Sequence, residues 1–175
     1  MKIQKIIIDN YRGVNVPTEI TLNDFTCIVG KNDAGKSTIL KALDIFLNDG
    51  NVSVDDRNIY SQNDIISVEV AFLCNGEEIT IDDAIKSTFM EEELVDSDGL
   101  LHIKKTWDTI QKAIKPKVYI KRKKYEQDDF LLIPEKNLMQ LCQKNDIATI
   151  KGNGEEYNNR EKRTKLREYY QVNNF

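Results

Sequence analysis

The chain has 175 residues, a formal net charge of −4, and a composition that is 40% hydrophobic and 31% charged. This length fits one globular unit, and the composition is that of an ordinary folded protein rather than a disordered or fibrous one. The longest apolar runs are far shorter than the roughly 18 residues that span a bilayer. The first residues lead into a strand pattern rather than a secretory signal, so we expect a cytoplasmic protein.

Cysteine and histidine are sparse. Cys27, Cys74 and Cys142 are widely spaced and form no C-x-x-C pair, which argues against a disulfide framework or a zinc site. Cys27 and Cys74 lie in apolar strand-like runs, where a reduced cysteine acts as a small buried hydrophobe. The one histidine, His102, has no second ligand nearby, so we expect an exposed or half-buried strand residue.

The N-terminal part of the chain is predicted to contain strands and one helix. Residues 2–9 are a β-branched run that predicts a strand, and residues 17–22 predict a short partner strand. The apolar run 25–29 predicts a strand buried on both faces. Apolar residues at helical spacing predict a helix that begins at Lys36 and stops at Asn48-Asp49-Gly50.

The remainder is predicted to add antiparallel strands and then helices. A strand is expected at 65–74, and Asn75-Gly76 predicts a hairpin turn that returns residues 78–81 antiparallel to it. The acidic stretch 82–99 is predicted to be helical. Further strands are expected at 100–107 and 117–125, and helices from Pro134 and from about Glu155, separated by a break at 151–154.

The last residues still follow helical spacing, at Leu166, Tyr169, Tyr170 and Val172. A helix this polar needs a partner to be stable. We therefore expect the front part of a longer polypeptide, cut off in a helical arm, with a short natural protein as the alternative.

One motif carries chemistry. Gly30-Lys31-Asn32-Asp33-Ala34-Gly35-Lys36-Ser37, followed by Thr38, fits the phosphate-binding pattern G-x-x-x-x-G-K-[ST]. The glycines let the backbone wrap so that successive N–H groups point at a phosphate, and Lys36 can reach the β- and γ-phosphates. The Ser37 hydroxyl is placed to coordinate Mg²⁺, and the helix N-terminus adds partial positive charge. We therefore predict that ATP and Mg²⁺ bind at residues 30–38.

The loop, together with the strand before Asn10-Tyr11-Arg12-Gly13, resembles the ABC-type ATPase heads of the SMC, RecF and OLD (overcoming lysogenisation defect) group. The Asn-Asp-x-Gly-Lys variant is most similar to the OLD-family ATPases of anti-phage defence nucleases. The likeness is specific over residues 1–50 and looser over 51–125, where the Asp55-Asp56 turn and the strand from Ile65 resemble that group's antiparallel subdomain.

This resemblance implies an α/β P-loop NTPase fold. Residues 1–130 would be the N-terminal lobe of an ABC-type ATPase head, with an antiparallel β subdomain at about 63–125. Residues 131–175 would begin a helical arm or dimerisation region. The resemblance further implies head-to-head dimerisation around ATP, an approach of Arg12 to the nucleotide, and coupling to a DNA-acting nuclease. It leaves open which glutamine, Gln62, Gln127 or neither, serves the Mg²⁺ site.

Two hydrolysis motifs of this group are missing from the sequence. A Walker B strand ending in Asp-Glu is not found: three partial matches end at Asp9, at Asp82-Asp83 and at Pro134-Glu135, and each departs from the pattern. No Ser-Gly-Gly signature occurs either. We therefore expect this chain to bind ATP without hydrolysing it.

Charge is segregated along the sequence. Residues 104–124 contain nine basic residues and a single acidic one, Asp108. A basic stripe of this kind can follow a nucleic-acid backbone. The alternative is a solvated strand edge, where lysines discourage pairing between sheets. The basic residues are Lys104, Lys105, Lys112, Lys115, Lys117, Lys121, Arg122, Lys123 and Lys124.

Two other functions stay open. One is an SMC- or RecF-like module that binds DNA under nucleotide control and carries no nuclease. The other is a small stand-alone P-loop kinase or GTPase, which is disfavoured because no guanine-reading Asn-Lys-x-Asp is present.

Overall fold

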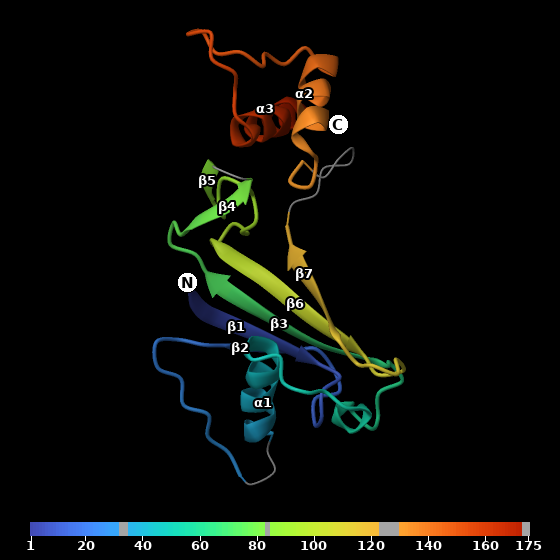
Figure 1. Ribbon diagram of the computed structural model, residues 1–175. Helices are drawn as coiled ribbons and strands as arrows, with labels where there is room; N and C mark the ends of the chain where they lie inside the picture. The colour runs from blue at the N-terminus through green and yellow to red at the C-terminus, as the bar shows by residue number, and fades with distance from the viewer. Residues whose placement is uncertain (32–34, 83–84, 123–129, 173–175) are drawn as a thin grey trace. The chain divides into compact units, whose positions relative to one another are not determined.

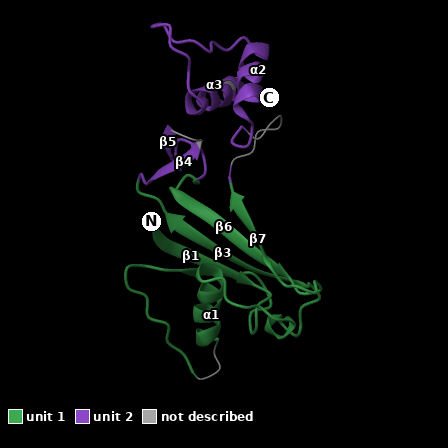
Figure 2. Ribbon diagram, viewed as in Figure 1, with its two compact units in different colours: residues 1–75, 95–121 green, residues 76–94, 122–175 purple. Residues whose placement is uncertain are grey.

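The computed structural model describes residues 1–31, 35–82, 85–122 and 130–172. It divides into two compact units, coloured separately in Figure 2. Unit 1 comprises Met1–Asn75 and Val95–Lys121, and unit 2 comprises Gly76–Leu94 and Arg122–Phe175. Unit 2 thus combines an insertion within the unit 1 sequence with the C-terminal part of the chain.

Unit 1 is built on a five-stranded antiparallel sheet with the strand order β2-β1-β3-β6-β7 (Figure 1). The predicted strands at 2–9, 17–22, 65–74 and 100–107 are confirmed. The strand predicted at 117–125 is observed as far as Lys121, and residues 123–129 lie outside the described part. The strands are β1 (Lys2–Asp9), β2 (Thr18–Thr21), β3 (Ile65–Leu73), β6 (Leu100–Asp108) and β7 (Pro116–Lys121).

The helix predicted from Lys36 is confirmed as α1 (Lys36–Leu47), and it covers one face of this sheet. Because side chains alternate along a strand, the isoleucines and valines of β1 and β3 that share this face meet the apolar stripe of α1. The shared core contains Ile6, Ile8, Val68 and Val70 from the strands, Ala42, Ile45 and Phe46 from α1, and Tyr11 and Trp107. The helix that follows the phosphate-loop sequence is therefore packed directly on the sheet.

The strand predicted at residues 25–29 is wrong. Residues 26–31 have no regular secondary structure, and Phe25 and Val29 are each 86% exposed. A strand needs a neighbour to satisfy its backbone polar groups, and none of the described strands pairs with this segment. Cys27 is accordingly exposed, which corrects its predicted burial.

The hairpin predicted at Asn75-Gly76 is also wrong. Both edges of β3 are already occupied, by β1 and by β6, so the returning strand cannot pair with it. Instead β4 (Glu78–Asp82) pairs antiparallel with β5 (Ile85–Thr88) in a separate two-stranded sheet of unit 2.

The helix predicted at 82–99 does not form. Residues Ile85–Thr88 form strand β5, and turns follow it. The Glu91 carboxylate accepts a hydrogen bond from the Thr88 backbone N–H at 2.9 Å, which closes the first turn. Positive φ angles at Glu93 (53°) and Gly99 (75°) are incompatible with a continuing helix.

Unit 2 also contains two packed helices, α2 (Glu135–Lys144) and α3 (Asn159–Val172). Both were predicted, although α3 begins a few residues later than expected, because Asn158 and Glu161 form the reciprocal hydrogen bonds of a capping box. Leu138 and Cys142 of α2 pack with Leu166 and Tyr170 of α3 in a small core that includes Phe130. The polar C-terminal helix therefore has its packing partner within the chain.

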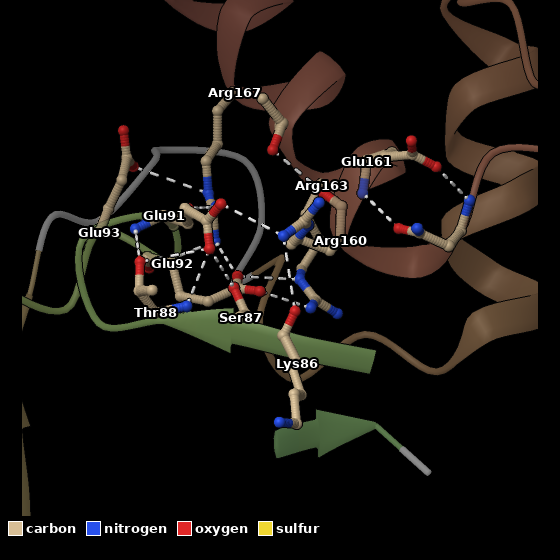
Figure 3. Close-up of polar contacts among 12 residues, drawn as sticks. Lys86, Ser87, Thr88, Glu91, Glu92, Glu93, Arg160, Glu161, Arg163 and Arg167 are labelled. Atoms are coloured by element: carbon tan, nitrogen blue, oxygen red, sulfur yellow. Dashed lines mark hydrogen bonds and ion pairs between the residues drawn. The ribbon is translucent and has the colours of Figure 1, made fainter. Parts of the chain in front are cut away.

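A buried ionic cluster holds the turn after β5 against α3 (Figure 3). Glu92 accepts hydrogen bonds from Arg163, at 3.0 and 2.7 Å, and from Arg167 at 3.0 Å. Arg167 also donates to the main-chain oxygen of Glu91 at 2.8 Å. The face of α3 that contacts this turn is thus held by ion pairs and hydrogen bonds rather than by apolar contacts.

His102 is more deeply buried than the sequence predicted. It is 7% exposed, and its two ring nitrogens lie 2.8 Å from Glu69 Oε1 and 2.9 Å from Asp96 Oδ2. Each ring nitrogen is within hydrogen-bond distance of one carboxylate, so this side chain joins β6 to β3 and to the 96–99 turn. Among the described residues, no helix is both long and apolar enough to cross a membrane.

Candidate functional site

The predicted phosphate loop meets helix α1 at Gly35, whose backbone is in the left-handed conformation. Gly35 has φ +82° and is the N-cap of α1. Its carbonyl oxygen accepts hydrogen bonds from Thr38 N–H at 3.0 Å and Ile39 N–H at 3.4 Å, which starts the helix. Only glycine adopts this backbone conformation at no steric cost, which is why the motif places glycine here. The predicted residues Asn32, Asp33 and Ala34 lie outside the described part.

The Lys36 side chain connects the end of the predicted loop to its beginning. Its ammonium nitrogen donates to the carbonyl oxygens of Gly30, at 2.7 Å, and Lys31, at 2.5 Å. The first and last parts of the motif are therefore brought together around one positive charge, which is carried by a flexible side chain. A phosphate that enters the loop can replace these neutral acceptors with charged ones, which form stronger hydrogen bonds.

The start of α1 is suited to an anion. Among the residues that the structure describes, no side chain caps the helix, and its first turn contains no acidic residue. The first N–H groups of a helix lack intrahelical partners and carry partial positive charge, so an uncapped N-terminus is a site for phosphate. Ser37 is exposed here, whereas Thr38 is buried. Ser37 thus has the accessible hydroxyl that a phosphate-bound Mg²⁺ would take as a ligand, and Thr38 packs into unit 1.

Arg12 lies in the turn after β1 and contacts the segment 53–58. Its Nε and Nη2 lie 2.9 and 2.7 Å from the same Asp56 oxygen, and its guanidinium carbon lies 5.4 Å from the centre of the Tyr11 ring. Within segment 53–58 it is therefore held by the carboxylate of Asp56. Burial alone would lower the pKa of Arg12, but the hydrogen bond to Asp56 and the nearby charges outweigh burial and raise the pKa above its usual value.

The turn of Arg12 and the segment after α1 enclose an open groove of about 670 Å³. The buried Asn10 links one lining residue to β3: its Oδ1 accepts from Asn58 N–H at 3.2 Å, and its Nδ2 donates to the carbonyl oxygen of Ile65 at 3.1 Å. The lining residues are Arg12, Gly13, Asn15, Ser53, Asp55, Asp56, Arg57, Asn58, Ile59 and Tyr60. Sequence reasoning noted the Asp55-Asp56 turn but missed the contact of Asp56 with Arg12.

The basic segment is only partly available to a ligand. Lys105 donates to the carbonyl oxygen of Phe46 at 2.7 Å and to Asp49 at 2.6 Å, so it fastens the end of α1 to the sheet. In contrast, every residue of β7 is exposed. The register pairs Lys104 with Tyr119, Lys117 with Thr106 and Lys121 with His102, which puts these lysines on the sheet face opposite α1. Lys123 and Lys124 lie outside the described residues.

The three partial Walker B matches have different structural settings. Asp9 is the last residue of β1, and Asp82 ends β4 in unit 2, whereas Asp83 lies outside the described residues. Glu135 is an exposed residue in the first turn of α2. Within the described residues, no three His, Cys, Asp or Glu side chains cluster as metal ligands.

A left-handed glycine at the start of a helix that begins with the motif lysine and packs on a β-sheet matches the helix end of the P-loop sequence pattern. The comparison of sequence families is more specific: the AAA ATPase domain family matches residues 1–174. The chain belongs to this AAA ATPase domain family and is an ATP-binding ATPase module.

Among solved structures, the chain is similar to the SMC head domain from Thermotoga maritima, with a TM-score of 0.45 and 17% sequence identity. This match covers 70% of the present chain and 38% of the SMC head chain, so the present chain spans well under half of that structure. No curated protein sequence matches the chain.

Proposed function

We propose that this chain binds ATP together with Mg²⁺ at residues Gly30 to Thr38, with Lys36 as the main phosphate ligand. The observation that carries the proposal is the position of Lys36. Lys36 is the first residue of α1, and its ammonium group donates to the carbonyl oxygens of Gly30 and Lys31 at the start of the loop. Both charge and backbone donors are therefore gathered at one point, as phosphate binding requires.

Each described residue has a separate part in this binding. Lys36 exchanges its carbonyl acceptors for phosphate oxygens, and Gly35 permits the tight turn that aims the following N–H groups at the phosphate. The Ser37 hydroxyl is the candidate metal ligand. A bound Mg²⁺ would neutralise part of the phosphate charge and fix the orientation of the phosphate chain.

The experiment is a thermal-shift titration with ATP and Mg²⁺ on the wild type and on Lys36→Ala. Ligand binding to the folded state raises the melting temperature by an amount that grows with the logarithm of the ratio of ligand concentration to dissociation constant. We expect a concentration-dependent increase for the wild type and none for Lys36→Ala. The matched control is Lys41→Ala, an exposed lysine of the same helix, which should shift like the wild type. Equal shifts for Lys36→Ala and wild type would contradict the proposal.

We further propose that the ATPase is OLD-like, dimerises through its nucleotide-bound heads, and acts together with a DNA-cutting nuclease domain. This rests on the loop variant Asn32-Asp33-Ala34-Gly35-Lys36 and on the Asn10-Tyr11-Arg12-Gly13 turn. The gene sequence beyond codon 175 tests it. An acidic Toprim-like domain would support nuclease coupling. A long heptad coiled coil would favour a DNA-binding module without nuclease, and a stop codon would contradict both.

A further inference from the structure

His102, the one histidine of the chain, lies between two carboxylates within unit 1. Its Nδ1 is 2.8 Å from Glu69 Oε1 on β3, and its Nε2 is 2.9 Å from Asp96 Oδ2 in the turn before β6. The imidazole side chain is more deeply buried than either carboxylate. These two carboxylates are therefore the immediate polar surroundings of the ring.

The number of protons on the ring decides whether both contacts are favourable. A ring with one proton donates through one nitrogen and presents a lone pair at the other, whereas a ring with two protons donates through both. An ionised carboxylate only accepts, so a singly protonated ring would face one of its two partners with lone pair against lone pair. Leaving a buried polar group without its hydrogen bond costs free energy. Both distances are therefore favourable together only when these three side chains share one additional proton.

Asp96 is held by its own turn as an ionised acceptor. Its Oδ1 accepts hydrogen bonds from the backbone N–H groups of Asp98 and Leu100, each at 2.9 Å, and its Oδ2 is left for the ring. Burial alone would raise the pKa of Asp96, but the hydrogen bonds from Leu100 and His102 outweigh burial and lower the pKa below its usual value. The additional proton therefore does not reside on Asp96.

The other titratable groups on this face of the sheet are exposed or already paired. Lys5 forms an ion pair with Glu19 at 2.8 Å, and the other four side chains are exposed, so solvent screens their charges. The direct contacts with the two carboxylates therefore dominate the electrostatic environment of the ring. The groups are Lys5 of β1, Lys104 of β6, Tyr119 and Lys121 of β7, and Asp98 of the turn.

The turn that contains Asp96 lies where the chain returns to unit 1. The chain leaves unit 1 after Asn75, directly beyond β3, and re-enters it at Val95. The Cys74 N–H donates to the carbonyl oxygen of Gly99 at 3.2 Å, so the backbone already joins the exit to the turn. The His102 ring adds a side-chain connection between the same strand and the same turn.

We propose that Glu69, His102 and Asp96 form a pH-sensitive clasp. With two ring protons, His102 holds the 96–99 turn to β3. When the pH rises and the ring loses one proton, one carboxylate loses its donor, and the turn that receives the returning chain is held less firmly. The clasp belongs to unit 1 alone and does not depend on nucleotide binding.

The test is an NMR titration of the full chain between pH 5 and pH 9. Because the chain has one histidine, its ring ¹⁵N signals are assigned without ambiguity and report the number of ring protons. We expect the amide signals of Asp98 and Leu100 to shift with the same midpoint as the ring. Hydrogen exchange at Leu100, corrected for its intrinsic pH dependence and referred to Ile45 of α1, should be about tenfold faster above that midpoint.

Variants separate the clasp from a general effect of charge. Glu69→Gln and Asp96→Asn each replace a carboxylate by a neutral amide and should lower the midpoint of the ring titration by about one pH unit. The matched control is Asp98→Asn, which neutralises an exposed carboxylate of the same turn and should leave the midpoint nearly unchanged. In His102→Gln, the exchange ratio of Leu100 to Ile45 should no longer depend on pH. If His102→Gln fails to fold, the two carboxylate variants decide the matter, because they retain the ring.

Three results would overturn the inference. A ring that stays singly protonated from pH 5 to pH 9 would place the additional proton on a carboxyl, and a ring that stays doubly protonated would not be a switch. A ring that titrates while the Leu100 exchange ratio stays constant does not hold the turn. Equal changes of midpoint in Asp96→Asn, Glu69→Gln and Asp98→Asn would show a general effect of charge rather than a clasp.

Discussion

The Glu92 carboxylate lies against Arg163 in the interior of unit 2, with 2.7 Å between Glu92 Oε1 and Arg163 Nη2. The two residues are 71 positions apart in the sequence, and the Glu92 side chain is fully buried. Arg167 approaches the second oxygen of the same carboxylate, as Figure 3 shows. A buried charge is tolerated only when it is paired and hydrogen-bonded, so this cluster fixes which turn α3 can pack against.

Removing the carboxylate should destabilise unit 2 strongly. Glu92→Ala leaves the guanidinium groups of Arg163 and Arg167 buried without their central partner, and breaking a buried pair in this way costs about 3–5 kcal/mol. Urea unfolding monitored by circular dichroism measures the change. The control is Glu168→Ala, which truncates an exposed glutamate of α3, the helix that carries Arg163 and Arg167. This substitution should change the unfolding free energy by less than about 0.5 kcal/mol. Equal effects of the two substitutions would show that the cluster does not stabilise α3.

The same cluster should make the protein sensitive to acid. Burial alone would raise the pKa of Glu92, but hydrogen bonds from Arg163 and Arg167 outweigh it and lower the pKa below its usual value. A folded-state pKa below the unfolded one gives stability that is present above about pH 4.3 and is lost as the pH falls through the folded-state pKa. Unfolding free energies measured between pH 7 and pH 3 should therefore fall less steeply for Glu92→Gln than for the wild type. Parallel pH profiles would contradict this.

We predict that the 175-residue chain binds ATP but does not turn it over. Phosphate binding by a loop stabilises substrate and transition state to similar extents, which leaves the chemical barrier nearly unchanged. The sequence has no Walker B Asp-Glu pair to orient an attacking water and no Ser-Gly-Gly signature. Phosphate release with excess ATP and Mg²⁺ should therefore be the same for the wild type and Lys36→Ala. A Lys36-dependent rate would show that the active site is complete within this chain.

The exposed lysines on the β6–β7 face give a prediction about DNA. If Lys104, Lys117 and Lys121 contact a nucleic-acid backbone, their joint replacement by glutamate should weaken DNA binding and reduce its salt dependence. A control with the same change in net charge replaces three exposed lysines elsewhere, Lys41, Lys136 and Lys144. Fluorescence anisotropy at several salt concentrations measures both quantities. Equal losses in the two triple variants would leave this face as ordinary solvated surface.

The sequence predicts local features of this protein well and non-local pairing poorly. The phosphate loop and α1 are encoded by neighbouring residues, and both the spacing and the stop at Asn48 are visible in the sequence. The errors at 25–29 and at 78–81 concern strand pairing, which depends on edges already occupied by distant strands. The helix predicted at 82–99 is wrong because Ile85–Thr88 pairs with β4 as a strand and turns follow it. The Arg12–Asp56 contact was missed for the same reason, because 44 residues separate its partners.

The central claim is that the segment from Gly30 to Thr38 holds the phosphates of ATP. Backbone amide resonances of the ¹⁵N-labelled protein, followed by NMR during titration with ATP and Mg²⁺, locate the binding site directly. We predict that the largest shifts occur at Gly30, Gly35, Lys36 and Ser37, and that Lys36→Ala abolishes them. Saturable shifts confined to unit 2, or shifts at the loop that persist in Lys36→Ala, would contradict the account.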